Sequence, residues 1–241
     1  MALPKLQHPT FEVKIPSTGA KVTLRPYTVK EQKILLTIKD SEDENEISDL
    51  LLQLISACCL TEGFNPKKLA YFDIEYLFLK LRAKSVGEVV EVSYKCNNIV
   101  SESPCGTVNT FEINLDNTAV DFEGSKKNEF EIQDGLTVKM LYPNLKSMTL
   151  VEKYNATKQL DHLLEAIAYS LDYVADSESV YDSFTKDEVK AFLSDLSVES
   201  FEKFLEFFIS LPKIREKVKF KCKKCGYEDV IVLSGLIDFF V

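Results

Sequence analysis

Hydrophobic and polar residues alternate at the start of the chain. Phe11, Val13 and Ile15 are separated by charged residues, and the same period resumes at Val22 after the segment 16–19, which holds Pro and Gly. A period of two is typical of a strand with one buried face, and Pro and Gly supply turn geometry. The pattern predicts an N-terminal β-hairpin.

The apolar spacing becomes helical between residues 28 and 84. Thr-Val-Lys-Glu at 28–31 and Ser-Glu-Asp-Glu at 41–44 fit the capping box, in which a hydroxyl and a carboxylate bind free backbone N–H groups. The Asn-Pro pair at 65–66 is a helix-start signal. These signals predict three helices, the third over residues 66–84.

A period of two returns between residues 86 and 142, which predicts strands. The alternating apolar positions are Val90, Val92, Tyr94, Phe111, Ile113, Leu115, Phe130, Ile132, Val138 and Met140. Asp134 and Gly135 form the strongest short hairpin signal in the chain. The polar segment 114–128 has no clear period, so we expect a long loop there.

Helical spacing dominates residues 144–215, where a third capping box lies at 185–188. The apolar stripes are Leu160, Leu163, Leu164, Ile167 and Leu171, and then Phe201, Phe204, Leu205, Phe208 and Leu211. The chain then returns to a β pattern over 217–233. Because a terminal strand needs a partner, we expect this segment to pair with the earlier β region.

The six cysteines carry the sharpest chemical signal. Cys222 and Cys225 lie in a Cys-x-x-Cys-Gly sequence, whose turn can direct two thiolates at one metal ion. Cys96 and Cys105 form a second pair, also followed by glycine, and an aromatic residue stands two positions before the first cysteine of each pair. Four thiolates leave no open coordination position, so the pattern predicts a structural zinc ion in a zinc-ribbon-like module.

The spacing of the first pair departs from the usual knuckle. Eight residues separate Cys96 from Cys105, so the segment 97–104 has to loop out. Two alternatives stay open: a disulfide or redox pair, and four free cysteines. The redox alternative is disfavoured because no βαβ pattern surrounds Cys222.

These patterns predict an α+β fold that is mostly helical, with antiparallel β-hairpins and a zinc-ribbon-like module built from two distant segments. We expect an N-terminal hairpin and helical region over 1–85. A β region should combine 86–143 with 217–241, and residues 144–216 should form a helical insertion.

No catalytic constellation is recognisable in the sequence. His8 and His162 lack a nucleophile or carboxylate at a known catalytic spacing, and both are interpreted as surface histidines. Cys58 and Cys59 lie in an apolar helix and are interpreted as small core residues. Nucleotide-binding glycine motifs are absent. The sequence therefore predicts that the protein is not an enzyme.

Charge is divided unevenly along the 241 residues, whose formal net charge is −9. Residues 160–206 hold 12 acidic and 3 basic residues, whereas 213–224 hold 7 basic residues and one acidic residue. The basic run fits an acidic protein partner better than nucleic acid, because base-stacking aromatics are few. No secretory signal or membrane-spanning run is visible, which indicates a cytoplasmic protein with reduced thiols.

Two apolar segments are candidate partner surfaces. The helix around 71–88 is apolar over much of its circumference, and so is the C-terminal segment 235–241. Each is interpreted either as core or as a docking element.

Several of these features together resemble the baseplate hub protein family of T4-like contractile-tailed bacteriophages. The specific part is Phe-Asp-Ile-Glu-Tyr-Leu-Phe at 72–78, followed by Leu-Arg-Ala-Lys-Ser-Val-Gly-Glu at 81–88. The turn at 15–19, Leu-Arg-Pro-Tyr at 24–27 and the cysteine pairs complete the similarity, which covers nearly the whole chain.

The resemblance implies a late viral protein made in the cytoplasm of the host bacterium, with a place in the virion tail baseplate left open. Its partners would be other baseplate hub or tail assembly proteins, with a homo-oligomer also possible, and no catalytic residues are implied. The alternative is a zinc-ribbon protein that binds nucleic acid or acts in transcription. Salt-dependent binding to nucleic acid would favour that alternative.

Overall fold

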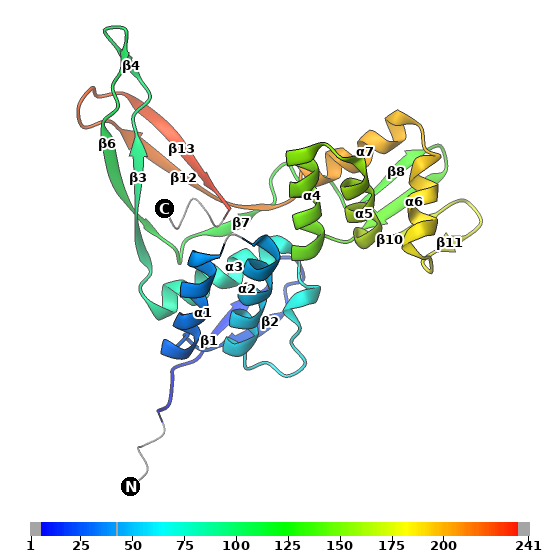
Figure 1. The fold of residues 1–241 in the computed structure, drawn as a ribbon, viewed down its shortest axis with the longest axis horizontal. Coiled ribbons are helices and arrows are strands. Elements are labelled where there is room, and N and C mark those ends of the chain that lie inside the picture. Colours follow the sequence, from blue (N-terminus) through cyan, green and yellow to red (C-terminus); the bar gives the residue numbers. More distant parts are fainter. Residues whose placement is uncertain (1–5, 42, 236–241) are drawn as a thin grey trace.

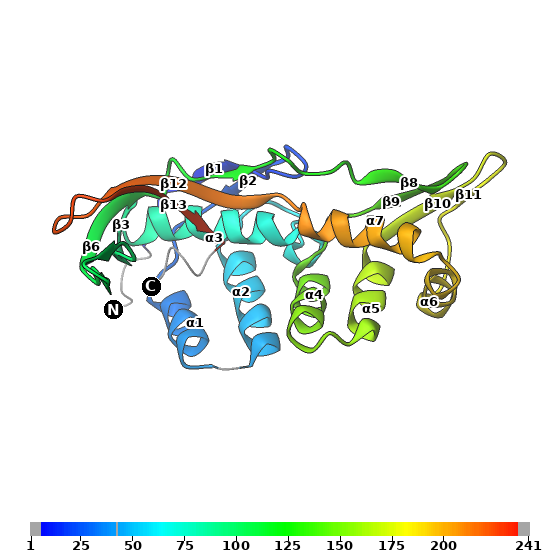
Figure 2. The ribbon, with the colours of Figure 1, turned by 90° about the horizontal axis from the view of Figure 1, so that it is seen from above.

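The computed structural model describes residues 6–41 and 43–235, and the candidate docking segment beyond Gly235 lies outside this range. Within these residues the chain is a mixed α/β structure with seven α-helices and antiparallel strands (Figure 1), which confirms the expected combination of helices and hairpins. Figure 2 shows strands on one side, α1, α2, α4 and α5 on the other, and α3 and α7 between them.

The bounds of the helices follow the chain order. They are α1 (Val29–Asp40), α2 (Glu44–Cys58), the short 3-10 helix η1 (Pro66–Lys68), α3 (Tyr71–Ser85), α4 (Leu145–Thr157), α5 (Leu160–Ser170), α6 (Lys186–Ser194) and α7 (Val198–Ile209). The strands are β1 (Phe11–Lys14), β2 (Lys21–Leu24), β3 (Val89–Lys95), β4 (Ile99–Val100), β5 (Ser103–Pro104), β6 (Val108–Asn114), β7 (Ala119–Asp121), β8 (Glu129–Gln133), β9 (Leu136–Met140), β10 (Leu171–Ala175), β11 (Val180–Tyr181), β12 (Lys213–Lys221) and β13 (Glu228–Ser234).

The predicted N-terminal hairpin is present as β1 and β2, which pair antiparallel. Its turn is bound to α3, because Ser17 donates its backbone N–H to Asp73 at 2.9 Å and its hydroxyl to the same carboxylate. Asp73 is fully buried, so these bonds satisfy a carboxylate that would otherwise be unpaired inside the protein. The hairpin packs on α2 and α3 around Leu24 and Leu77.

The local start signals are correct in three of four places, since Asn65 caps η1 with Pro66 in its first turn. Thr28 and Thr185 begin α1 and α6 with capping boxes as predicted. The box predicted at Ser41 is wrong, because Asp43 is the residue that caps α2, with its side chain accepting the N–H of Asn45. The third helix is interrupted between Pro66 and its predicted end, since an extended segment separates η1 from α3.

Residues 144–211 form a helical layer on a four-stranded sheet, ordered β11-β10-β9-β8. The core between them is built from α5, α6 and α7 with Phe204 and Phe207 at its centre. Leu171, which the sequence pattern assigned to a helix, begins β10 and pairs with Met140. This layer also takes up β8 and β9, whose residues the sequence division assigned to the β region.

Two long hairpin ribbons form an arm that extends from the rest of the molecule (Figure 1). One ribbon is β3 with β6, and the other is β12 with β13. Their inner faces meet through Val90, Val92, Ile113, Ile214 and Leu233, against Leu79 of α3. The expected pairing of the terminal β segment with the earlier β region is found, because β12 also pairs with β7. The segment 114–128 was predicted to be a long loop. It contains the short strand β7, so the prediction is wrong for that part of the segment.

The base of the arm is held by a buried lysine on α3. The Lys80 Nζ donates to the carbonyl oxygens of Leu115, Asp116 and Thr118 at 2.9, 2.7 and 3.1 Å. These carbonyls belong to the bend between β6 and β7, where the Leu115 carbonyl also accepts the N–H of Thr118 at 3.3 Å. One ammonium group thus replaces the hydrogen bonds that water would make to three carbonyls.

We expect Lys80→Met to lower the free energy of unfolding by about 2 kcal/mol, because it leaves buried carbonyls without donors while keeping most of the side-chain volume. The measurement is urea unfolding followed by circular dichroism. Lys84→Met is the matched control, since Lys84 lies one turn further on and pairs with Asp116 at a more exposed position. An equal loss in both variants would contradict the role assigned to Lys80.

Candidate metal centre

The four predicted cysteine ligands converge at the far end of the arm. Cys96 follows β3 and Cys105 precedes β6, whereas Cys222 follows β12 and Cys225 precedes β13. The four sulfur atoms all lie within 4.8 Å of one another. Each ribbon thus supplies one pair, and residues more than 100 positions apart in the sequence form one cluster.

The sulfur spacing fits a tetrahedral metal site. Cys96 Sγ lies 3.7 Å from Cys225 Sγ, and Cys105 Sγ lies 3.8 Å from Cys222 Sγ. Four sulfurs at about 2.3 Å from a tetrahedral Zn²⁺ are about 3.8 Å apart. A disulfide needs about 2.05 Å, and all four cysteines are free thiols in the structure. The four close cysteines can therefore hold a metal ion.

The two cysteine turns share one backbone pattern. In the first, the N–H of Gly106 donates to the Cys96 carbonyl at 3.0 Å, and the N–H of Cys96 donates to the Thr107 carbonyl at 2.9 Å. In the second, Gly226 and Cys222 make the same two bonds at 3.0 and 2.8 Å, the latter to Tyr227. Both glycines have positive φ, 64° and 72°, a conformation that favours glycine. The two cysteine turns are therefore an internal repeat within the site.

Asn109 connects the two turns and was not foreseen from the sequence. Its Oδ1 accepts the N–H of Lys223 at 2.9 Å, and its Nδ2 donates to the Thr107 carbonyl at 3.0 Å and lies 3.8 Å from Cys222 Sγ. The side chain is 1% exposed. The sequence did contain a signal for this role. Position 109 falls where the alternation of β6 requires an apolar residue on the inner face, and a polar Asn stands there.

The surroundings of Cys96 and Cys222 shift their thiol pKa values in opposite directions. Burial raises the pKa of the Cys96 thiol, whereas backbone N–H donors of Cys225 and Lys224 lower the pKa of Cys222 to about 6. The Thr107 side chain and backbone lower the pKa of Cys105. Two members of the cluster are therefore stabilised as thiolates, which is the form that binds metal.

The long first spacing is accommodated by a small hairpin. Residues 97–104 loop out of the site, as the prediction required, and form β4 and β5, in which Ile99 pairs with Pro104 and Val100 with Ser103. Asn98 of this loop lies with its Nδ2 3.7 Å from Cys225 Sγ. Aromatic residues also pack around the cluster: the ring centroids of Tyr94 and Phe111 lie 5.2 and 5.9 Å from that of Phe220.

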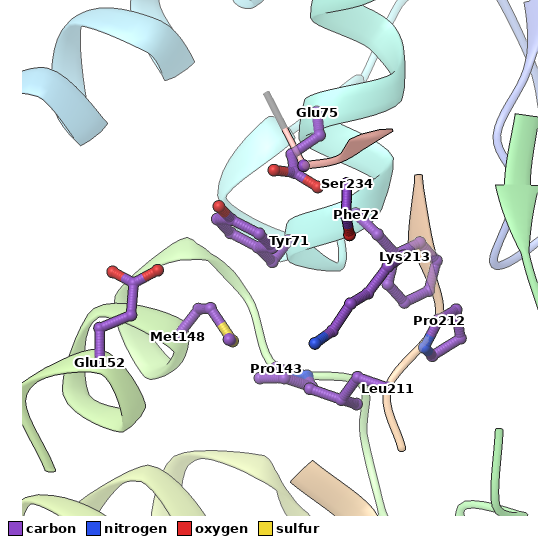
Figure 3. A pocket seen from close by; sticks show the side chains of 11 residues that line it. Tyr71, Phe72, Glu75, Pro143, Met148, Glu152, Leu211, Pro212, Lys213 and Ser234 are labelled. Atoms are coloured by element: carbon purple, nitrogen blue, oxygen red, sulfur yellow. The ribbon is translucent and has the colours of Figure 1, made fainter. Parts of the chain in front are cut away.

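A second candidate site is a pocket of about 200 Å³ where α3, α4 and the start of β12 meet (Figure 3). Tyr71, Glu75 and Lys213 bring polar groups to it, and burial together with the Glu75 carboxylate raises the pKa of Tyr71. Asp73 faces the N-terminal turn instead, so Asp73 and Glu75 do not act as a pair. The lining of the pocket contains no histidine or cysteine, and thus no imidazole base or thiol nucleophile.

The remaining candidate residues are structural. Cys58 is fully buried in the core, as predicted, and Cys59 is partly buried beside it. His8 is exposed, as predicted. His162 is not a plain surface residue, because it is half-buried on α5 and its Nδ1 is enclosed without a hydrogen bond in the described part of the chain.

The basic run lies along the outer face of β12. Its exposed members are Lys213, Arg215, Lys217, Lys219 and Lys221. Arg215 pairs with Asp121 and Lys221 with Glu228. Lys217 and Lys219 lie opposite the exposed Val232 and Val230 of β13 and form no ion pair in the described ranges. This face is therefore cationic and partly apolar.

The fold and the site define a class of protein: a mixed α/β protein in which four clustered cysteines join distant segments of the chain. Among its described helices none is long and apolar enough to cross a membrane. The chain belongs to the T4 bacteriophage base plate protein family, whose model matches residues 8–241. This confirms the resemblance stated from the sequence.

A curated relative agrees with the family assignment. The chain is 26% identical over 232 residues to the baseplate hub assembly protein gp26 of Enterobacteria phage T4. The aligned region covers 95% of this chain and 96% of that protein. No solved structure matches the chain.

We expect Asn109→Ala to weaken metal binding at the cysteine cluster by about tenfold or more, because residues behind the ligands fix their orientation. The measurement is competition with a chromogenic chelator. Thr110→Ala is the control, since Thr110 lies next to it on β6 but is exposed. Equal affinity in Asn109→Ala and the parent protein would show that the ligands hold their geometry without this side chain.

Proposed function

We propose that this protein takes part in assembling the central hub of a phage tail baseplate, through protein–protein contacts and without catalysis. The observation that carries the proposal is the match to a hub assembly protein over 95% of this chain and 96% of the relative, since a match of that extent relates nearly the whole of both sequences. The family match does not favour the alternative of a nucleic-acid-binding zinc ribbon.

We also propose that Cys96, Cys105, Cys222 and Cys225 bind one structural Zn²⁺ in a zinc-ribbon-like module. The sulfur distances of 3.7 and 3.8 Å and the repeated turn geometry support zinc. When bound, the ion would hold the two ribbon ends together by four metal–sulfur bonds. The four thiolates would fill the coordination sphere, with the N–H donors stabilising the sulfurs from outside it, so the site would have a structural role.

The charge distribution supports contact with other proteins. The outer face of β12 is cationic, and the acidic excess of residues 160–206 is shared by α5, α7 and the segment around β10 and β11. We propose that these two surfaces are used by different hub partners or by a second copy of this chain. Assembly would take place in the host cytoplasm, before or during incorporation into the baseplate.

The three-part organisation predicted from the sequence is retained as a proposal with two boundaries changed. Residues 129–140 pack with the helical layer, so we place them with it instead of with the ribbons. The helical layer ends at residue 212, because β12 begins at Lys213. The arm, 86–121 with 213–235, would then be the partner-reaching part, and the other two parts its support.

Metal analysis should find about one zinc per chain in protein purified under reducing conditions. We expect Cys222→Ser to remove the zinc and to lower the melting temperature by about 5 °C or more, because metal binding is coupled to folding of the arm. Cys59→Ser, a cysteine outside the cluster, should keep the full zinc content. A folded parent protein with four reduced thiols and no metal would contradict the zinc proposal.

Affinity capture of the tagged full-length chain from phage-infected cells tests the proposed function directly. We expect baseplate hub proteins of the same phage among the captured proteins, identified by mass spectrometry, and no nucleic acid retained at 50 mM salt. Recovery of nucleic acid or polymerase in place of hub proteins would favour the alternative.

A further inference from the structure

The internal repeat in the metal centre shows which residues the site does not need. The second cysteine turn closes with two residues between its cysteines, Lys223 and Lys224. The first makes the same glycine and cysteine backbone bonds but has eight residues between its cysteines, 97–104. Asn97 and Asn98 take the places of the two lysines, since the Asn98 carbonyl accepts the N–H of Cys105 at 2.7 Å and the Asn98 Nδ2 lies 3.7 Å from Cys225 Sγ. The six residues 99–104 are therefore additional to the turn, and their presence needs another explanation.

These additional residues form a tight, strained hairpin. Ile99 pairs with Pro104 and Val100 with Ser103, so Ser101 and Glu102 make a two-residue turn. Both have positive φ, 49° and 68°. Such turns favour Asn and Gly, and other residues adopt this conformation at an energetic cost. The hairpin thus has a turn conformation that its own residues do not favour.

The hairpin has apolar side chains on both faces and projects from the end of the arm. Ile99 is 69% exposed and Val100 is 45% exposed, at the outermost point of the arm (Figure 1). Neighbouring residues of a strand point to opposite faces. A flat partner surface would cover one of these side chains and leave the other in water, so a slot with two apolar walls is the better complement.

The base of the hairpin is surrounded by unpaired cations. Lys95, Lys223 and Lys224 are exposed next to the cysteines, and none forms an ion pair within the ranges that the structure describes. The hairpin itself carries a single charge, that of Glu102. A partner that encloses the apolar tip would thus meet these lysines at its rim, where carboxylates would complement them.

We propose that the hairpin formed by β4 and β5 is a docking tip that inserts into an apolar slot with an acidic rim on a baseplate hub protein. This inference rests on the proposed function and names the surface that performs it. The metal centre would act as the rigid base that presents the tip. Residues 97–104 contain no aromatic side chain, lysine or arginine, so the tip itself has no means of stacking on bases or binding phosphates.

The test compares two exposed hairpins in the same protein. The variant Ile99→Ser with Val100→Ser changes the tip, and the matched control Val180→Ser with Tyr181→Ser changes β11, which is also a two-residue strand and is 64% and 52% exposed. The two strands lie at opposite ends of the molecule (Figure 1). Both full-length variants and the parent are tagged, and hub proteins captured from infected cells are quantified by mass spectrometry.

We expect the tip variant to capture at least tenfold less hub protein than the parent, with unchanged zinc content and melting temperature. The β11 control should capture as much as the parent. Deleting 99–104, which leaves Asn97 and Asn98 between the cysteines and so reproduces the two-residue spacing of the second turn, should give the same loss with the metal retained. Equal capture by the parent and the tip variant would overturn the docking tip while leaving the proposed function intact.

A photo-crosslinking amino acid at position 99, with position 180 as control, keeps the test decisive where a variant folds poorly. Crosslinks from position 99 to an identified hub protein support the proposal, and their absence in a sample that does capture hub proteins overturns it. If the parent captures no hub protein, the proposed function itself fails. Binding of the parent to vesicles of phosphatidylglycerol that is lost in the tip variant would assign the tip to lipid and overturn the protein slot.

Discussion

The fold depends on a helix, α3, whose charged side chains are buried and satisfied by distant segments. Lys80 donates to three carbonyls at the base of the arm, and Asp73 accepts two bonds from the N-terminal turn. Phe72 of the same helix packs edge-on against Tyr142, at the entry to the helical layer. A buried charge without partners would strongly destabilise the protein. Each of these contacts therefore fixes the position of one part of the molecule relative to the others.

Toward the far end of the arm the apolar core becomes small, so other contacts have to hold the two ribbons together. Near α3 the ribbons enclose an apolar cluster, but at their far end the buried hydrophobic residues are reduced to Phe220, Cys96 and Cys222. Two-stranded ribbons are marginally stable in water by themselves. The stability of the far end must therefore come from the sulfur cluster and from Asn109, which ties one turn to the other.

Sequence patterns predicted the features whose cause is local, and missed those decided by distant partners. The capping residues Thr28 and Thr185 and the N-terminal hairpin follow from neighbouring side chains, and the cysteines could be grouped because thiols have few alternative uses. The strand β7 exists because β12 supplies its hydrogen bonds, and β10 replaces the expected helix end because β9 pairs with it. Neither partner can be identified from the period of a single segment.

The same distinction explains why the docking tip is invisible in the sequence pattern. Residues 97–104 carry no hairpin signal of the Asn-Gly type and were expected only to loop out between two ligands. Their meaning emerges from comparison with the second turn, which closes the same bonds with two residues. A rigid thiol cluster then gives a short, strained hairpin a fixed direction, and less ordering entropy is lost when it enters a partner. An arm built in this way presents its apolar tip in a defined orientation, and that is the property required of a component that brings hub subunits together.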